Sequence, residues 1–145
     1  MFRGRFDHSI DVKGRLSIPS RYREVLQSRY GDEHLILTGF DRCLWGYPLK
    51  EWEEIEKRIA KLPQFKREVK AIQRLFVSAA MDCPVDNQGR ILIPANLRSY
   101  ARMEKDIVIV GMTRRIEFWD KDLWQEEIEK AESNVEWEAL AEFDL

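Results

Sequence analysis

The sequence predicts an α+β fold in which two copies of one small unit interleave to form a barrel with two-fold pseudosymmetry. The first observation is a repeated phrase, DVKGR at 11–15 and DNQGR at 86–90, each followed by an apolar run that ends in a proline. The second is a longer match between LILTGFDRCLWGYPLKEW (35–52) and IVIVGMTRRIEFWDKDLW (107–124). One unit alone has too few strands to bury its apolar residues, so we expect the two copies to share a core.

Each unit begins with a predicted hairpin. Phe6, His8 and Ile10 alternate with polar residues, which is typical of a strand with one buried face. Gly14 and Gly89 permit the positive φ of a tight turn between this strand and the apolar strand that follows.

The prolines at 19 and 94 end the second strand, because proline has no N–H to donate to a neighbouring strand. The elements predicted after them are short helices at 20–27 and 95–101, apolar strands at 35–38 and 107–110, bends at Gly39 and Gly111, strands around 44–45 and 116–118, and helices that open near Pro48 and Asp120.

Two segments keep alternative interpretations. Apolar residues at helical spacing, Trp52 to Leu62 and Phe65 to Phe76, predict two helices that pack on the chain's own sheets or form a contact with another helix or subunit. The acidic C-terminal segment carries Trp137, Leu140 and Phe143, and either docks as a helix or frays. The predicted division is a first unit at 5–47, a helical connection at 48–78, a second unit at 79–121 and an acidic helix or tail at 122–145.

Composition excludes several classes of protein. Hydrophobic residues make up 44% of the 145 residues, enough for a core, but no apolar stretch is long enough to span a membrane, and no signal peptide is evident. Cys43 and Cys83 are far apart and have no CxxC partner, which favours two buried apolar side chains in a cytoplasmic protein.

Charge is distributed unevenly along the chain, although the net charge is only −2. Residues 1–30 contain seven Lys or Arg and three acids, a net charge of +4, whereas residues 115–145 contain three basic and eleven acidic residues, a net charge of −8. This asymmetry predicts one electropositive surface that is kept apart from an acidic tail.

Catalytic motifs are absent. Neither His8 nor His34 lies in a metal-binding or catalytic motif, and the sequence has no phosphate-binding loop and no nucleophile elbow. We therefore expect no enzyme activity, no metal and no cofactor.

The repeated DxxGR phrase is the candidate site. Across the turn, Asp11 and Arg15 are expected to form a bidentate ion pair, as are Asp86 and Arg90. This pair either only stabilises the turn or also positions the arginine for a phosphate or a guanine edge. Other cations expected near the first turn are Lys13, Arg3, Arg5, Arg21 and Arg23, whereas the second turn has only Arg90, so the first is expected to dominate binding.

These residues resemble a known family. The opening MFRGRFDHSIDVKGRLSIPSRYRE, the second DNQGRILIPANLR and the tract EIEKRIAKLPQFKREVKAIQRLFVSAA between them are similar to the MraZ transcriptional regulators of bacteria. The resemblance covers nearly the whole chain and includes both DxxxR motifs in order.

The resemblance implies two SpoVT-AbrB-like units joined in a swapped-hairpin, double-psi-like barrel, assembled as a homo-oligomeric ring in the cytoplasm on the nucleoid. It implies binding to double-stranded DNA with tandem repeats, in the promoter of the division and cell-wall operon, and thereby regulation of that operon. The alternative on the same fold is an antitoxin-like module that binds a protein partner through the acidic C-terminal segment.

Overall fold

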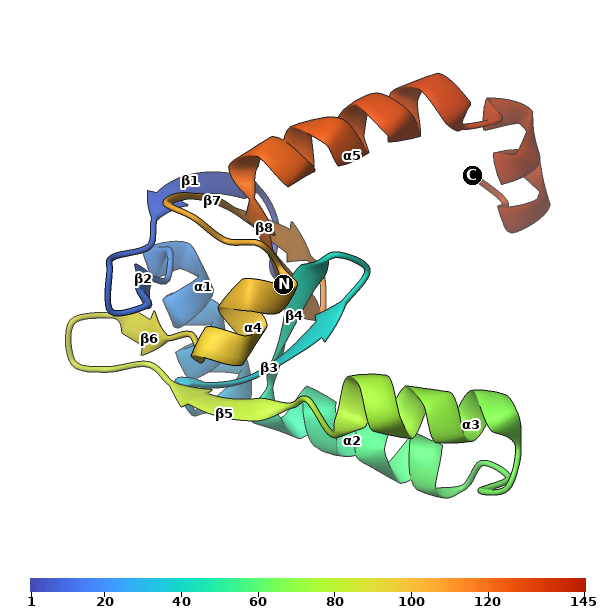
Figure 1. Ribbon diagram of the computed structural model, residues 1–145, viewed down its shortest axis with the longest axis horizontal. Helices are drawn as coiled ribbons and strands as arrows, with labels where there is room; N and C mark the ends of the chain where they lie inside the picture. The colour runs from blue at the N-terminus through green and yellow to red at the C-terminus, as the bar shows by residue number, and fades with distance from the viewer.

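The computed structural model describes residues 1–145 and confirms an α+β protein in which the strands and helices of two units alternate along the chain (Figure 1). The strands are β1 (Arg5–Ser9), β2 (Arg15–Ser17), β3 (His34–Phe40), β4 (Cys43–Pro48), β5 (Met81–Pro84), β6 (Arg90–Leu92), β7 (Asp106–Met112) and β8 (Arg115–Asp120). The helices are α1 (Ser20–Val25), α2 (Leu49–Ala60), α3 (Arg67–Ile72), α4 (Ala95–Tyr100) and α5 (Lys121–Asn134). Two π-helical turns, Leu26–Tyr30 and Gln73–Val77, extend α1 and α3, and a 3₁₀ helix spans Trp137–Phe143.

The strands form a six-stranded antiparallel sheet in the order β1-β7-β8-β4-β3-β5 and a separate antiparallel pair, β2–β6. Exchanging the equivalent strands of the two units (β1 with β5, β2 with β6, β3 with β7, β4 with β8) reverses the sheet order and leaves the pairings unchanged. The topology therefore has the expected two-fold pseudosymmetry. Each unit contributes its first strand to the other, because β1 pairs with β7 and β5 pairs with β3.

The predicted hairpins need a correction. β1 and β2 lie on either side of the first turn, but they pair with β7 and β6 of the second unit and not with each other. A sequence pattern reveals that a strand has one buried face, but it does not identify the strand that supplies its hydrogen bonds.

One apolar cluster lies between the six-stranded sheet and the β2–β6 pair. It contains nineteen buried residues drawn from both units. Leu16 of β2 and Ile91 of β6, at 0% and 1% exposure, point into it, as do Leu37 of β3 and Ile109 of β7. A shared core of this kind explains why neither unit is expected to fold alone.

Gly39 and Gly111 do not form bends, so that expectation was wrong. Both lie inside strands, and the reversals follow them at 41–42 and 113–114. A Cβ atom on Gly39 would lie 2.7 Å from the Tyr100 ring, and one on Gly111 would lie 2.5 Å from the backbone nitrogen of Arg3. Glycine is needed there for close approach of a neighbouring segment.

The helices begin where the sequence indicates. Pro19, Pro48 and Pro94 each directly precede the first residue of a helix. Asp120 caps α5, since its carboxylate accepts hydrogen bonds from the backbone N–H groups of Asp122 and Leu123 at 3.2 and 3.4 Å. The first short helix ends earlier than expected, at Val25, and continues as a π-helical turn.

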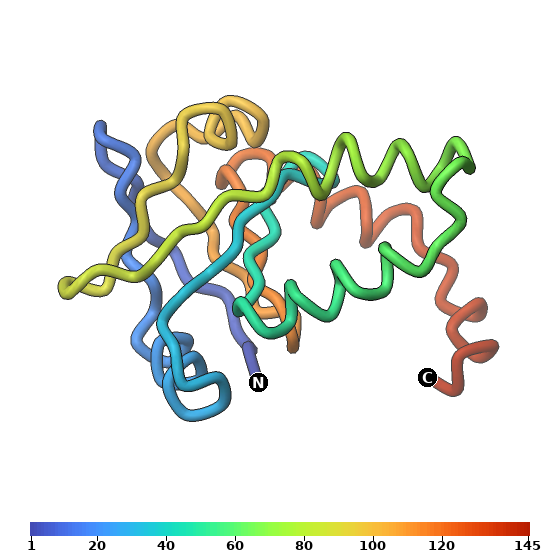
Figure 2. Tube along the Cα trace, turned by 90° about the horizontal axis from the view of Figure 1, so that it is seen from below, coloured from blue at the N-terminus to red at the C-terminus, as the bar shows by residue number.

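Two arms leave the β core on one side, away from the turns at 11–15 and 86–90 (Figures 1 and 2). The helical arm, residues 49–77, is α2, α3 and the π-helical turn after it. Its Trp52 and Phe76 pack with Ile36 and Tyr47 of the sheet, which confirms packing on the chain's own strands. The end of this arm is different, because Leu62 and Phe65 are exposed.

The C-terminal arm, residues 121–145, is α5 and the 3₁₀ helix. It packs on β7 and β8 near its start, where the rings of Trp119 and Trp124 are 5.6 Å apart. Neither of its two helices has a buried residue. The segment is thus helical and docked at one end only.

Both cysteines are buried and unbridged, as expected. None of the helices has the length and apolar character that a membrane span requires.

Candidate nucleic-acid interface

The first DxxGR turn is built on backbone hydrogen bonds to one carboxylate. Oδ1 of Asp11 accepts from the backbone N–H of Lys13 at 3.0 Å and from that of Arg15 at 2.9 Å. Gly14, at φ +90°, donates its N–H to the carbonyl of Asp11 at 3.0 Å. Aspartate is suited to this position because its short side chain reaches backbone groups two and four residues later.

The second turn repeats the same geometry. Oδ1 of Asp86 accepts from the backbone N–H groups of Gln88 and Arg90 at 2.8 and 2.9 Å. Gly89, at φ +77°, donates to the carbonyl of Asp86 at 3.0 Å. The change from Val12-Lys13 to Asn87-Gln88 therefore leaves the backbone of the turn unaltered.

The ion pair of each turn has one contact and is not bidentate, contrary to expectation. Nε of Arg15 lies 2.7 Å from Oδ2 of Asp11, and Nε of Arg90 lies 3.4 Å from Oδ2 of Asp86. Since Oδ1 is used by the backbone, only one carboxylate oxygen remains for the guanidinium. The terminal nitrogens of both arginines make no hydrogen bond within the chain, and they remain available as donors.

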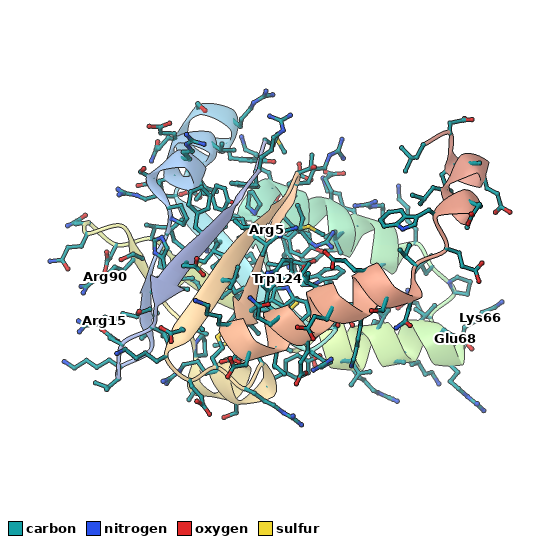
Figure 3. The ribbon with its side chains drawn as sticks, turned by 90° about the horizontal axis from the view of Figure 1, so that it is seen from above. Arg5, Arg15, Lys66, Glu68, Arg90 and Trp124 are labelled. Atoms are coloured by element: carbon teal, nitrogen blue, oxygen red, sulfur yellow. The ribbon has the colours of Figure 1, made fainter.

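Both arginines lie on the same face of the β2–β6 pair. In the antiparallel register Arg15 is opposite Leu92 and Ser17 is opposite Arg90, so Arg15 and Arg90 are diagonal neighbours, about 7–8 Å apart. Leu16 and Ile91 point to the core, and the alternate face with the arginines is turned to solvent. Figure 3 shows Arg15 and Arg90 together at one end of the molecule.

A second pair of arginines links the turns across the pseudosymmetry. A Cβ atom on Gly14 would lie 2.9 Å from the guanidinium of Arg98, and one on Gly89 would lie 2.5 Å from that of Arg23. The helix of each unit thus places an arginine against the turn of the other unit. The backbone does the same, because Ile18 donates to the carbonyl of Gly89 and Ile93 to that of Gly14, both at 2.8 Å.

Sequence analysis missed the role of Arg98 and placed Arg23 at the first turn. The signal was present, since Arg23 and Arg98 each follow a proline by four residues. The second turn therefore has a cation from the first unit, Arg23, in addition to its own Arg90. Nε of Arg23 is paired with Glu33 at 3.2 Å.

The other predicted cations are scattered. Lys13, at the tip of the first turn, and Arg21, on α1, are exposed and form no ion pair. Arg3 and Arg5 lie at the opposite end of β1 from the turn, and the guanidinium of Arg5 lies 5.2 Å from the ring of Trp124 on α5 (Figure 3). The structure does not bring Arg3 and Arg5 beside the first turn.

The carboxylates of both turns are stabilised in the charged form. Hydrogen bonds from the backbone N–H of Arg15 lower the pKa of Asp11 below its ordinary value, and those from Arg90 lower the pKa of Asp86. Each aspartate is therefore ionised at neutral pH. No three His, Cys, Asp or Glu side chains gather where they could hold a metal ion.

Comparison with known protein families identifies the family to which the chain belongs. The family model "MraZ protein, putative antitoxin-like" matches residues 1–75 and again residues 76–143. The chain belongs to the MraZ family. Its two consecutive matches confirm the duplicated unit and the resemblance seen in the sequence.

Individual MraZ relatives match nearly from end to end. The transcriptional regulator MraZ of Pelotomaculum thermopropionicum is 48% identical over 136 residues, which cover 94% of this chain and 91% of the relative. That of Natranaerobius thermophilus is 41% identical and covers both chains completely, and that of a Thermoanaerobacter species is 42% identical over 98% of this chain and 95% of the relative. The family is one of transcriptional regulators and not of enzymes.

Proposed function

We propose that the chain is a sequence-specific regulator of transcription that binds double-stranded DNA through the exposed face of its β2–β6 pair. The observation that carries this proposal is the state of Arg15 and Arg90. Each is held at Nε by the aspartate of its own turn, while its terminal nitrogens have no partner in the chain.

An arginine held in this way is ready to bind. Its remaining N–H groups fit the O6 and N7 acceptors of guanine or two phosphate oxygens, and less side-chain entropy is lost because Nε is already fixed. A two-stranded antiparallel pair fits into the major groove, which is about 12 Å wide. Lys13 and Arg21, exposed and unpaired, would contact the phosphates on either side.

We further infer that the DNA carries tandem repeats in the promoter of the division and cell-wall operon, and that several copies of the chain bind it together as a ring in the cytoplasm, on the nucleoid. One subunit offers few cations, so a single repeat would be bound weakly. Linked subunits that face successive repeats raise the affinity about 10²–10⁴-fold through effective concentration.

We also infer the fold's finer type and division. The exchange of β1 and β5 between the units favours the swapped-hairpin, SpoVT-AbrB-like barrel, with units at 5–47 and 79–121, a helical connection at 48–78 and the acidic segment at 122–145.

Footprinting on the DNA upstream of the protein's own gene tests the proposal. We expect protection of several regularly spaced short repeats, and a gel-shift affinity that falls at least about a hundredfold when the repeats are reduced to one. Affinity should also decline steeply with added salt, because each phosphate contact releases counterions. Equal affinity for one and several repeats would contradict the assembly, and no protection anywhere in that DNA would contradict the function.

A second candidate is an antitoxin-like module that binds a protein partner through the C-terminal arm. The exposed side chains of Trp137 and Phe143 favour it, as does the antitoxin-like description of the family model. In a pull-down from the native cytoplasm, this candidate predicts a partner that the wild-type chain retains and a Trp137→Ser/Phe143→Ser variant loses. The DNA-binding proposal predicts instead that the variant keeps its affinity for a single repeat.

A further inference from the structure

The two arms carry opposite charge. Residues 57–74, at the end of the helical arm, contain seven basic side chains and one acidic one, a net charge of +6. Residues 129–145, the distal part of the C-terminal arm, contain six acidic side chains and one lysine, a net charge of −5. In the first region only Lys57 forms an ion pair, and in the second region no residue does.

The C-terminal arm also presents a regular apolar stripe. Trp137, Leu140 and Phe143 follow one another every three residues in a 3₁₀ helix, whose three residues per turn place them on one side. Trp137 is 65% exposed and Phe143 is 68% exposed. Exposed aromatic side chains in such a row are typical of a segment that docks on an apolar surface.

A matching apolar groove lies between the helical arm and the sheet. It has a volume of about 430 Å³, and its wall contains one charged residue, Arg58. The other lining residues are Phe40, Trp45, Tyr47, Ile55, Ile59, Ile72 and Phe76. Pockets of roughly 300–1,000 Å³ accept ligands of several rings, so two large side chains of the stripe fit here.

The chain's own stripe lies outside this groove. The start of α5 lies over β7 and β8, on the same face of the sheet as the groove but beside it, where Arg42 pairs with Glu126 and Glu127 at 3.0 and 3.7 Å and Trp124 packs on Trp119. Figure 1 shows the helix leaving the core as a straight rod, separate from the helical arm. Figure 3 shows Lys66 and Glu68 of the helical arm and the 3₁₀ helix at the end of the molecule opposite Arg15 and Arg90.

We propose that the stripe of Trp137, Leu140 and Phe143 docks in the groove of a second copy of this chain, with its acidic neighbours against the basic end of that copy's helical arm. Charge complementarity selects this occupant, because the acids beside the stripe form no ion pair within the chain, and neither do the bases beside the groove apart from Lys57. The interface is head-to-tail, since two different surfaces meet, and repetition of one such contact closes into a ring when the rotation permits. This inference rests on the assembly of several copies that the proposed function includes, but not on DNA binding.

Light scattering on the full-length chain without DNA tests this contact. Trp137→Ser/Phe143→Ser removes the stripe and Ile59→Glu places a charge in the groove, while Arg58→Glu reverses the groove's one charge at an exposed position with little risk to the fold. Leu145→Ser is the matched control, an exposed apolar residue of the same arm outside the stripe. We expect the wild-type chain and the control to form assemblies of several copies. The stripe variant and Ile59→Glu should have the mass of one chain, 17.3 kDa. Arg58→Glu should need at least about tenfold more protein to assemble.

Mixing the stripe variant with the Ile59→Glu variant makes the test specific. Each then supplies the surface that the other lacks, so a head-to-tail contact predicts a one-to-one heterodimer and nothing larger. The proposal is overturned if the stripe variant forms assemblies of the same mass as the wild-type chain. It is also overturned if the wild-type chain stays monomeric. Either result is compatible with a stripe that folds onto the groove of its own chain. A mixture without heterodimer also overturns it, because the stripe then docks elsewhere. Single-repeat gel shifts on the same variants report separately on DNA binding.

Discussion

The two DxxGR turns have the same backbone but different tips. In both, one aspartate accepts two backbone N–H groups at 2.8–3.0 Å and a glycine adopts positive φ. The first tip is Val12-Lys13 and has the shorter ion pair, whereas the second is the uncharged Asn87-Gln88. The aspartate and the glycine thus set the shared backbone geometry of the two turns, while the tip residues differ, and we expect them to determine how strongly each turn attracts an anion.

Replacing the arginines is expected to have the largest effect on binding. Arg15→Ala should weaken binding to tandem repeats by about 1–3 kcal/mol, because a directed charged contact is lost. Arg90→Ala should cost less, since no lysine stands beside it. Stability to unfolding should change by at most about 1 kcal/mol in either variant, as for an exposed ion pair. Gel shifts and urea unfolding measure both quantities, and equal losses of affinity for the two variants would show that the turns act equally.

The glycines test the shared backbone. Gly14→Ala and Gly89→Ala should each lower the free energy of unfolding by about 1–2 kcal/mol, because a side chain is disfavoured at positive φ. Gly14→Ala should be the worse of the two. Its Cβ would lie 2.9 Å from the carbonyl oxygen of Ile93, which is fixed backbone, whereas the Cβ on Gly89 would meet the flexible side chain of Arg23. Thermal unfolding measures which of the two variants is less stable. A Gly14→Ala variant as stable as the wild-type chain would argue against the observed turn.

The smallest effect concerns pH. The folded pKa values of Asp11 and Asp86 lie below the ordinary value of 3.8. Their contribution to stability is therefore complete above about pH 4 and is lost as the pH falls through the lowered pKa. Asp11→Asn and Asp86→Asn should each reduce the difference in unfolding midpoint between about pH 5 and about pH 3. Similar reductions in the two variants would support backbone hydrogen bonds as the main cause of the lowered pKa values. An effect of Asp11→Asn alone would instead assign the lowered pKa to the shorter ion pair.

Local features of the fold were predictable from the sequence. The repeat, the strand and helix positions, the helix starts at Pro48 and Asp120 and the buried cysteines follow from periodicity and from residue chemistry in short windows. Contacts between the units were not predictable in this way. The pairing of β1 with β7, the approach of Tyr100 to Gly39 and the position of Arg98 against Gly14 depend on how two distant segments meet.

The candidate site was predicted in part. Arg15 and Arg90 were identified, and the structure places them on one face. The clustering of Arg3 and Arg5 with them was wrong, because the five residues of β1 separate its two ends by about 13 Å. The bidentate pair was wrong because the backbone N–H groups already occupy one oxygen of each carboxylate.

Exchange of the two tips tests most directly the claim that the first turn dominates DNA binding. One variant, Val12→Asn/Lys13→Gln, gives the first turn the second tip, and the other, Asn87→Val/Gln88→Lys, gives the second turn the first tip. Affinity for tandem-repeat DNA is measured over a range of salt concentrations. We predict weaker binding and a salt slope lower by about 1 for the first variant, and tighter binding and a slope higher by about 1 for the second. Unchanged affinity and slope in both variants would contradict the account.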